Sequence, residues 1–250
     1  KEQGIYYTPK FVTDYIVKET VGRFIKEHSY NDIFNIKILD PACGSGSFLI
    51  RAYDELLHYH ARQKGKSPAE LDHWERLSIL NRNIFGVDLD RQAVEITRLS
   101  LLLRSLMKRE ILPSLADNIR QGNSLISGTE EELRHYFGDN WQEKKPFNWE
   151  EEFKDIMANG GFDVVIGNPP HGAKLDSRTI NYISHSNLGM EGSHNSAILF
   201  TKRGLQLTRV QGLITFVIPK SFCYSDSWKA ARLLLYKELL TLLDVSMGFE

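Results

Sequence analysis

The segment Asn168-Pro-Pro-His171 joins an amide, two prolines and an aromatic ring directly after an apolar run. Proline fixes its own φ angle and has no N–H group, so Pro169 and Pro170 make a stiff turn whose carbonyl oxygens stay free. The Asn168 side-chain oxygen and the Pro169 carbonyl oxygen can then both accept hydrogen bonds from one amine. The His171 ring can stack on a planar base. A purely structural Asn-Pro-Pro turn is the alternative.

A glycine-rich turn, Asp40-Pro-Ala-Cys-Gly-Ser-Gly46, follows an expected strand and opens an expected helix. Glycine lets the backbone pass close to a ligand, and the first turn of a helix points N–H groups outward. Ligands of doubly wound sheets bind at the carboxyl ends of the strands, where such turns lie. The segment therefore indicates a ligand-binding loop, although a Gly-x-Gly turn alone could also be a plain connection.

An acidic residue, Asp88, ends the next expected strand and can bind both hydroxyls of a ribose. Asp88 follows Asp40 by 48 residues, whereas the acid of a dinucleotide fingerprint comes about 20 residues after the glycines. This spacing disfavours a nicotinamide dinucleotide. Asp90 is expected to cap the helix that follows.

The remaining titratable residues suggest no metal centre. Two cysteines are too few for a disulfide framework or a zinc cage, and the eight histidines show no metal-ligand spacing. We therefore expect no metal. No apolar run approaches the ~20 residues that cross a bilayer. These features favour a cytoplasmic protein without a membrane partner.

The elements that must position these motifs alternate short β-branched runs with longer amphipathic stretches, which predicts an α/β fold with a mostly parallel twisted sheet and helices on both faces. Residue 8 is expected to cap the first helix, and residues 171–194 are expected to form a long loop. The expected strands are residues 36–40, 84–87, 118–121, 163–166, 212–218 and 239–245. The expected helices are residues 9–26, 47–63, 67–80, 90–109, 150–157, 195–208 and 225–235, with some helix in the polar connection 128–149.

Together, Asp40–Gly46 and Asn168–His171 resemble the motifs of DNA methyltransferases that act on the N6 amine of adenine. The Tyr7-Thr-Pro9 element comes before the glycine loop and the Asn-Pro-Pro motif after it, which resembles the gamma arrangement. The wider chain resembles the methylase part of Eco57I-like (type IIG) restriction-modification proteins. This resemblance implies the Rossmann-like fold of class I methyltransferases.

The resemblance implies that S-adenosyl-L-methionine lies across the strand ends. Thr8 and Pro9 would close over its methionine part, with Asp40, Ala42, Gly44 and Gly46 forming the loop beneath it. In the same family pattern, Asp88 would bind the ribose and Leu89 would contact the adenine ring. Asn123 stands where the family usually has an aspartate beside the adenine amine, and its amide keeps an oxygen acceptor.

For the methyl acceptor, the resemblance implies that Asn168 and Pro169 hold the amine of a flipped adenine. Base flipping is needed because the amine cannot be reached inside a duplex. His171 departs from the usual Tyr, Phe or Trp, and Phe249 is a candidate for a second ring against the base. Lys174 or Arg178, in the expected loop that also holds His185 and His194, would lie near phosphate.

The near-neutral charge of the chain bears on its partner, double-stranded DNA. A net charge of −1 lacks the basic excess that phosphate contacts usually require. We expect residues 1–30 to form a cofactor-capping segment and residues 31–250 the catalytic domain. A target-recognition domain, and possibly a nuclease domain, would lie elsewhere in a longer polypeptide.

Two other functions compete with DNA methylation. A glutamine-N5 methyltransferase of release factors uses a similar Asn-Pro-Pro motif, but the Tyr7-Thr-Pro9 element and the long 171–194 segment favour DNA. A catalytically weak DNA-binding subunit of a defence complex is the second alternative, and His171 is the feature that favours it.

Overall fold

A computed structural model of the protein describes residues 8–105, 114–189, 195–236 and 238–244. Its centre is a five-stranded sheet in the order β3-β2-β1-β4-β5, in which every neighbouring pair is parallel. The strands are β1 (Ile38–Asp40), β2 (Ile84–Asp88), β3 (Ile119–Gln121), β4 (Phe162–Gly167) and β5 (Thr208–Phe216). The strand order reverses at β1, which pairs with β2 on one side and β4 on the other.

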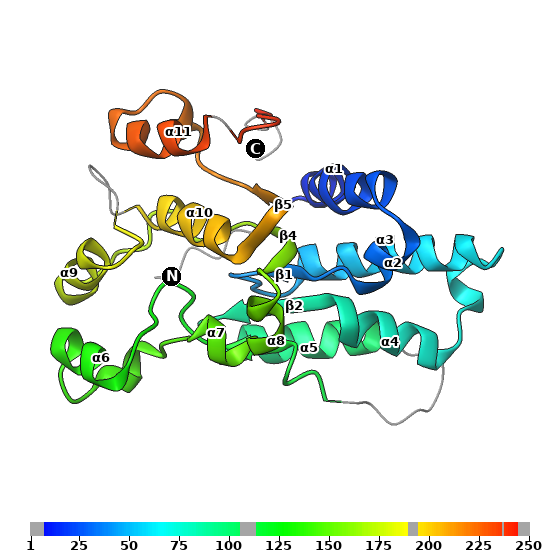
Figure 1. Ribbon diagram of the computed structural model, residues 1–250, viewed down its shortest axis with the longest axis horizontal. Helices are drawn as coiled ribbons and strands as arrows, with labels where there is room; N and C mark the ends of the chain where they lie inside the picture. The colour runs from blue at the N-terminus through cyan, green and yellow to red at the C-terminus, as the bar shows by residue number, and fades with distance from the viewer. Residues whose placement is uncertain (1–7, 106–113, 190–194, 237, 245–250) are drawn as a thin grey trace.

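Helices cover both faces of this sheet. In Figure 1, β5, β4, β1 and β2 follow one another down the middle of the molecule. Helices α1, α3, α4 and α5 pack on one face of the sheet, and α7, α8 and α10 pack on the other. Helices α6 and α9 pack against each other and α10, beyond the sheet. The α-helices are α1 (Lys10–Glu27), α2 (Tyr30–Asn35), α3 (Ser47–Gln63), α4 (His73–Asn83), α5 (Arg91–Ser105), α6 (Glu130–Phe137), α7 (Trp149–Glu152), α8 (Lys154–Ala158), α9 (Ser177–His185), α10 (Ser196–Leu207) and α11 (Lys229–Leu235). Short 3-10 helices span Pro68–Glu70, Trp141–Lys144, Lys220–Cys223 and Asp226–Trp228.

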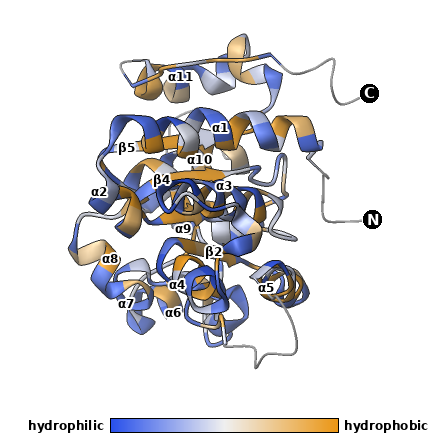
Figure 2. Cartoon of the chain, turned by 90° about the vertical axis from the view of Figure 1, so that its right-hand side faces the viewer, coloured by the Kyte–Doolittle hydropathy of each residue, from blue (hydrophilic) through white to orange (hydrophobic). Residues whose placement is uncertain are grey.

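The two faces of the sheet form separate cores because successive strand residues point to opposite sides. On β1, Ile38 packs in the cluster that includes buried residues of α1, α3, α4 and α5. Its neighbour Leu39 packs on the other face with Trp149 and Phe153. Figure 2 shows hydrophobic strands at the centre of the molecule. The predicted Rossmann-like α/β fold is confirmed.

Residues 67–80, predicted as one helix, form two pieces. The 3-10 helix Pro68–Glu70 ends at Leu71, and α4 begins after Asp72. Asp72 accepts a hydrogen bond from the Glu75 backbone N–H at 2.9 Å, and the Glu75 carboxylate accepts one from the Asp72 backbone N–H at 2.8 Å. This capping box starts a new helix, so the single-helix prediction was wrong.

The predicted loop 171–194 contains a helix, α9, within its described part. The Asp176 carboxylate accepts hydrogen bonds from the backbone N–H groups of Arg178 and Thr179, both at 3.1 Å, and so caps the helix. Tyr182 and Ile183 are buried against α6 and α10. The loop prediction was wrong because α9 is short. Its buried residues, Thr179, Tyr182 and Ile183, span little more than one helical turn, so the sequence shows no repeating apolar pattern.

Four smaller boundaries also differ from the predictions. Residues 239–244 contain no strand, since no described strand pairs with them. The predicted helix 150–157 is broken at Phe153 into α7 and α8. The residues before α11 form a 3-10 helix, Asp226–Trp228, and β5 begins at Thr208 rather than at residue 212.

Candidate active site

The predicted motifs meet at the carboxyl edge of the three central strands. Asp40 ends β1, Asp88 ends β2, and Asn168 follows β4 directly. Because β1 pairs in parallel with both β2 and β4, these three side chains belong to adjacent strand ends. This is the edge, next to the reversal of strand order, where doubly wound sheets bind ligands.

The glycine loop is tied to β2 and α5 by several hydrogen bonds. The Cys43 N–H donates to the Val87 carbonyl at 3.0 Å, and the Thr97 hydroxyl donates to the Gly44 carbonyl at 2.7 Å. Gly44 has a φ of +52°, and a Cβ at this position would meet no atom within 4 Å. At Gly46, with a φ of +83°, a Cβ would instead collide with Thr97. The loop is therefore held rigidly while its surface at Gly44 stays open.

Asp88 is oriented by the backbone around it. One carboxylate oxygen accepts the Gly44 N–H at 2.8 Å, and the other accepts the Asp90 N–H at 2.9 Å. Burial raises the pKa of Asp88 above its ordinary value, and these backbone hydrogen bonds oppose the rise. Asp90 itself accepts the Gln92 N–H at 2.9 Å, which confirms its predicted capping of α5.

Beside Asp88, the apolar side chain of Leu89 is exposed to solvent. Leu89 is 46% exposed, although its carbonyl oxygen accepts hydrogen bonds from Gln121 and Lys145. Asn123, on the same side, uses its amide oxygen to accept the Leu125 N–H at 3.1 Å. An exposed leucine beside a half-buried carboxylate is suited to a flat heterocycle attached to a ribose.

Asp40 lies deeper, with only 1% of its surface exposed. Burial raises the pKa of Asp40 to about 8, the nearby Asp88 adds to the rise, and a hydrogen bond from the Ala42 N–H opposes it. A buried carboxyl group with a raised pKa is costly to keep ionised. A cationic ligand group beside it would favour the carboxylate.

The Asn168-Pro-Pro-His turn is held at both ends. At its start, Asn168 Nδ2 donates to Thr8 Oγ1 at 3.0 Å. Farther on, the Ser196 hydroxyl donates to the Pro170 carbonyl at 2.6 Å and accepts the Ala173 N–H at 3.2 Å. Ser196 was not among the predicted site residues. Its partners lie 26 and 23 residues earlier in the chain, so no local pattern in the sequence marks its role.

Two acceptors of this turn have no hydrogen-bond partner within residues 8–105, 114–189, 195–236 and 238–244. Asn168 Oδ1 is buried and has no hydrogen-bond partner among the described residues. The Pro169 carbonyl oxygen likewise receives no hydrogen bond from the part of the chain that the structure describes. Buried polar atoms are almost always paired in folded proteins. An unpaired oxygen next to a second free acceptor therefore indicates a place for a donor such as an amine.

His171 is half-buried beside this turn. Its Nδ1 atom is buried without a partner among the described residues, and burial lowers the pKa of the ring. A lowered pKa keeps the imidazole neutral near pH 7, which favours stacking on a neutral base over pairing with phosphate.

Thr8 does not cap α1, as the sequence suggested. The N-cap is Pro9, which accepts the Val12 N–H and the Thr13 N–H through its carbonyl oxygen. The Thr8 side chain is turned toward Asn168 instead. The capping prediction was wrong because the proline carbonyl already receives the first helical bonds.

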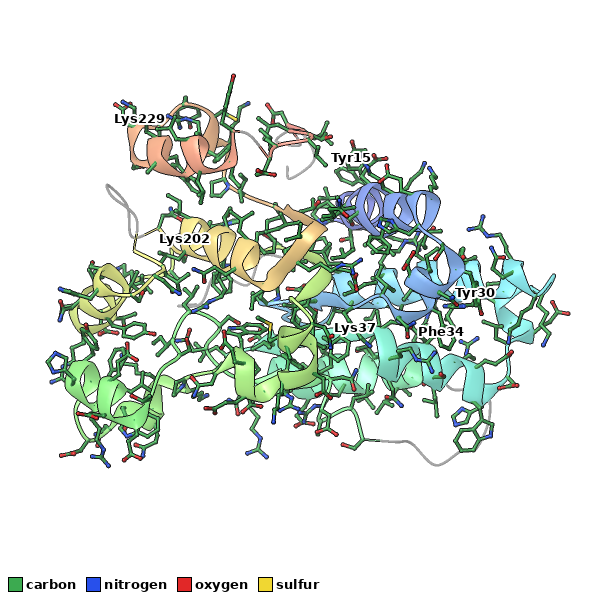
Figure 3. The ribbon with its side chains drawn as sticks, in the orientation of Figure 1. Tyr15, Tyr30, Phe34, Lys37, Lys202 and Lys229 are labelled. Carbon is green, nitrogen blue, oxygen red and sulfur yellow. The ribbon has the colours of Figure 1, made fainter. Side chains whose placement is uncertain are left out.

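Lys174 and Arg178, the two cations predicted to lie near phosphate, differ in their contacts. Arg178 is exposed and donates to the Phe137 carbonyl at 3.0 Å, at the end of α6, and its place near phosphate stays a prediction. Lys202, labelled in Figure 3, is similarly engaged with the Gly189 carbonyl. Lys174 is exposed, and its place near phosphate also stays a prediction. Phe249 and His194 lie outside the described residues.

A separate groove of about 680 Å³ lies at the opposite, amino-terminal edge of the strands. Lys37, labelled in Figure 3, lines it together with Asp163 and Arg209. The Asp163 carboxylate is the shared partner in this groove: it forms an ion pair with Arg209 at 2.6 Å and accepts the Lys37 backbone N–H at 2.6 Å. The unpaired acceptors described above are at the other edge.

Two further findings concern metals and membranes. Within the described residues, no three His, Cys, Asp or Glu side chains come together in a way that could hold a metal ion. No described helix combines the length and the apolar character that crossing a bilayer requires.

Comparisons with known proteins agree with this geometry. The chain is 29% identical to the type II restriction enzyme and methyltransferase RM.Eco57I of Escherichia coli, over 92% of the chain and 24% of that protein. It is 27% identical to the adenine-specific methyltransferase PglX of Streptomyces coelicolor, over 68% of the chain and 15% of that protein. The chain thus spans about a quarter or less of the length of these relatives.

A solved structure shares the fold. The ATP-dependent Type ISP restriction-modification enzyme LlaBIII bound to DNA has a TM-score of 0.63 at 19% identity, over 92% of this chain and 16% of that one. The family model of the Eco57I restriction-modification methylase matches residues 82–248, which include Asp88 and the Asn-Pro-Pro-His turn. The chain therefore belongs to the Eco57I restriction-modification methylase family.

Proposed function

We propose that this chain transfers a methyl group from S-adenosyl-L-methionine to the N6 amine of an adenine flipped out of double-stranded DNA, as part of a restriction-modification or phage-defence system. The observation that carries the proposal is a pair of acceptors without a hydrogen-bond partner among the described residues: the buried Asn168 Oδ1 and the carbonyl oxygen of the following Pro169. Family membership and the relatives named as adenine-specific methyltransferases support it.

The residues around the strand ends fit the cofactor. The glycine loop has open space at Gly44 and a fixed carboxylate at Asp88 for ribose hydroxyls. Leu89 offers an exposed apolar surface for an adenine ring. The buried Asp40 is suited to the α-ammonium group of the methionine part. S-Adenosylmethionine, when bound, supplies an electrophilic methyl group on its sulfonium.

The chain's own residues act on the acceptor. The amine of adenine is a poor nucleophile because its lone pair is conjugated with the purine ring. Hydrogen bonds from its two N–H groups to Asn168 Oδ1 and the Pro169 carbonyl would draw the nitrogen toward a tetrahedral geometry and localise that lone pair. Rate enhancement then comes from position and electrostatics, without a covalent intermediate on the enzyme.

The domain organisation forms part of the proposal. Residues 1–30 would cover the cofactor and residues 31–250 would carry catalysis. Target recognition, and any nuclease activity, would reside in other parts of a longer protein. Only Phe249 among the proposed base contacts lies outside the described residues.

The test uses the intact protein with labelled S-adenosylmethionine and two substrates, plasmid DNA and a release factor, beside a reaction without substrate. We expect label in DNA at N6-methyladenine. Asn168→Ala should lower the rate about 100-fold or more, as the loss of one hydrogen-bonding group at a reacting centre does. Asn159→Ala, an exposed amide at the end of α8, is the matched control and should leave the rate unchanged.

Two outcomes would overturn the proposal. Label in the release factor instead of DNA would make the chain a protein methyltransferase. Tight cofactor binding without transfer to any DNA, including genomic DNA from cells that lack the protein, would make it a non-catalytic subunit.

A further inference from the structure

The two ends of an asparagine amide are chemically opposite but nearly equal in shape. Only the oxygen accepts hydrogen bonds, and only the nitrogen donates. Rotation of the terminal torsion by 180° exchanges them at little steric cost. If Asn168 holds an amine, something must keep its oxygen, and not its NH₂ group, toward that amine.

One side chain in the structure already binds the nitrogen end of this amide. Thr8 Oγ1 accepts a hydrogen bond from Asn168 Nδ2 at 3.0 Å, across 160 residues of sequence. Thr8 is 6% exposed, so water does not readily replace its hydroxyl. With the nitrogen engaged there, the unpaired Asn168 Oδ1 is left as the end that can accept a donor.

The position of Thr8 is itself fixed. The next residue, Pro9, is the N-cap of α1, whose residues Val17, Val21 and Phe24 are fully buried in the main core. A threonine anchored to a packed helix can hold its partner better than one in a free arm. Because α1 is packed in the core, Thr8 is held in a fixed position beside the Asn168 amide.

We propose that Thr8 is a positioning residue for the methyl acceptor: its hydroxyl binds the nitrogen of the Asn168 amide and so holds that side chain in place with the oxygen toward the target amine. This inference rests on the proposed function. It differs from the role that sequence resemblance implies for Thr8, which is contact with the methionine part of the cofactor. The two roles predict different kinetic changes.

The experiment compares Thr8→Val and Thr8→Ser in the intact protein. Valine keeps the shape of threonine but leaves Asn168 Nδ2 without this acceptor, so the amide is no longer held in place by a hydrogen bond. We expect kcat to fall about 10-fold, with the Kd for S-adenosylmethionine, measured by calorimetry, changed less than 2-fold. Serine keeps the hydroxyl and should restore most of kcat.

Thr20→Val is the matched control. Thr20 is also a buried threonine of the same segment, and its hydroxyl donates to the Ile16 carbonyl at 2.7 Å. Removing it takes away a buried hydroxyl of α1 without touching Asn168, so kcat should stay as in the parent. Equal losses of kcat in Thr8→Val and Thr20→Val would reduce Thr8 to a structural role and overturn the proposal.

A second readout does not depend on activity. In protein labelled with ¹⁵N-asparagine, the Asn168 side-chain NH₂ signal, assigned by its loss in Asn168→Ala, should exchange slowly with water. It should exchange at least 10-fold faster in Thr8→Val. If no substrate is methylated while this difference is present, the proposed function fails and the Thr8–Asn168 contact stands.

Three results would contradict the inference. The first is a 10-fold rise in the Kd for S-adenosylmethionine in Thr8→Val with kcat unchanged, which would place Thr8 at the cofactor. The second is parent-like kinetics in Thr8→Val. The third is an unchanged exchange rate of the Asn168 amide. Thr8→Ala serves as the second variant if Thr8→Val does not fold, and the same outcomes apply to it.

Discussion

Gly167, the last residue of β4, lies directly against the Asp40 carboxylate at the end of β1. A Cβ on Gly167 would come within 2.6 Å of Asp40 Oδ1 and 3.0 Å of its Cγ atom. The proposed cofactor acid and the turn that carries Asn168 are therefore packed together through a position where only hydrogen fits. This contact joins the proposed cofactor side of the site, at Asp40, to the proposed acceptor side, at the turn that follows Gly167.

Substitution of Gly167 should disturb both sides. Gly167→Ala forces the Asp40 carboxylate to move, since a contact this short cannot persist. We expect a loss of about 1–3 kcal/mol in unfolding free energy, typical of overpacking, and weaker binding of S-adenosylmethionine. Urea unfolding and calorimetry measure the two effects.

Gly22→Ala is the control for this change. Gly22 lies inside α1, and its nearest neighbour to an added Cβ is 3.8 Å away. Alanine is favoured over glycine in a helix by about 1 kcal/mol, so the protein should be as stable as the parent or slightly more so. Parent-like stability and cofactor affinity in Gly167→Ala would contradict the packing argument.

The buried Asp40 carboxyl group should make stability depend on pH. Its pKa is raised by burial to about 8 in the folded protein, from about 3.9 in an unfolded chain. The folded state therefore holds the proton over a pH range in which the unfolded state has lost it. The contribution of Asp40 to the unfolding free energy is therefore most favourable at low pH, and it falls as the pH rises toward 8.

Asp40→Asn removes this titration. The unfolding free energy of the variant, relative to the parent, should rise between pH 5 and pH 7 by an amount on the order of 2 kcal/mol. Its affinity for S-adenosylmethionine should fall, because the carboxylate is lost. Asp117→Asn, at a side chain that is 96% exposed, should show a constant difference across the same range. If the difference in unfolding free energy between Asp40→Asn and the parent is also constant from pH 5 to pH 7, the prediction is wrong.

His171 should act as a neutral stacking ring. Stacking of an aromatic side chain on a base contributes about 1–3 kcal/mol, so His171→Ala should lower kcat/KM about 10-fold or more. His171→Tyr restores the ring type usual in the family and should retain the parent's kcat/KM or exceed it. The measurement is methyl transfer to DNA under steady-state conditions.

The pH profile adds a second check on His171. Because burial lowers the pKa of the ring, the neutral form should persist below the ordinary histidine pKa of about 6.5. The parent and His171→Tyr should then have the same pH dependence of kcat/KM around that value. His58→Ala, at an exposed histidine of α3, is the control. Activity of His171→Ala equal to the parent's would exclude a stacking role.

The sequence by itself determined the α/β class and the strand ends that carry chemistry. Apolar runs such as residues 164–166 are buried on both faces, and that pattern is local, so it can be read along the chain. The motifs at Asp40, Asp88 and Asn168 follow these runs directly. Parallel pairing then brings them to one edge without further information.

The tertiary structure decided which side chains hold the motifs in place. Thr8 meets Asn168 across 160 residues, and Ser196 meets Pro170 across 26. Nothing in either residue's neighbours specifies such a partner. A threonine before a proline helix start looks like a cap from its sequence, yet packing of α1 on the core turns it toward the active turn.

The same reason explains α9 and the contact of Asp40 with Gly167. Tyr182 and Ile183 are buried only because α6 and α10 lie beside them, and Gly167 is required only because Asp40 occupies the adjacent strand end. Hydrogen-bonding and apolar character are properties of single residues, and the sequence states them. Distance between residues far apart along the chain is set by how the helices and strands pack, and only the folded protein contains it.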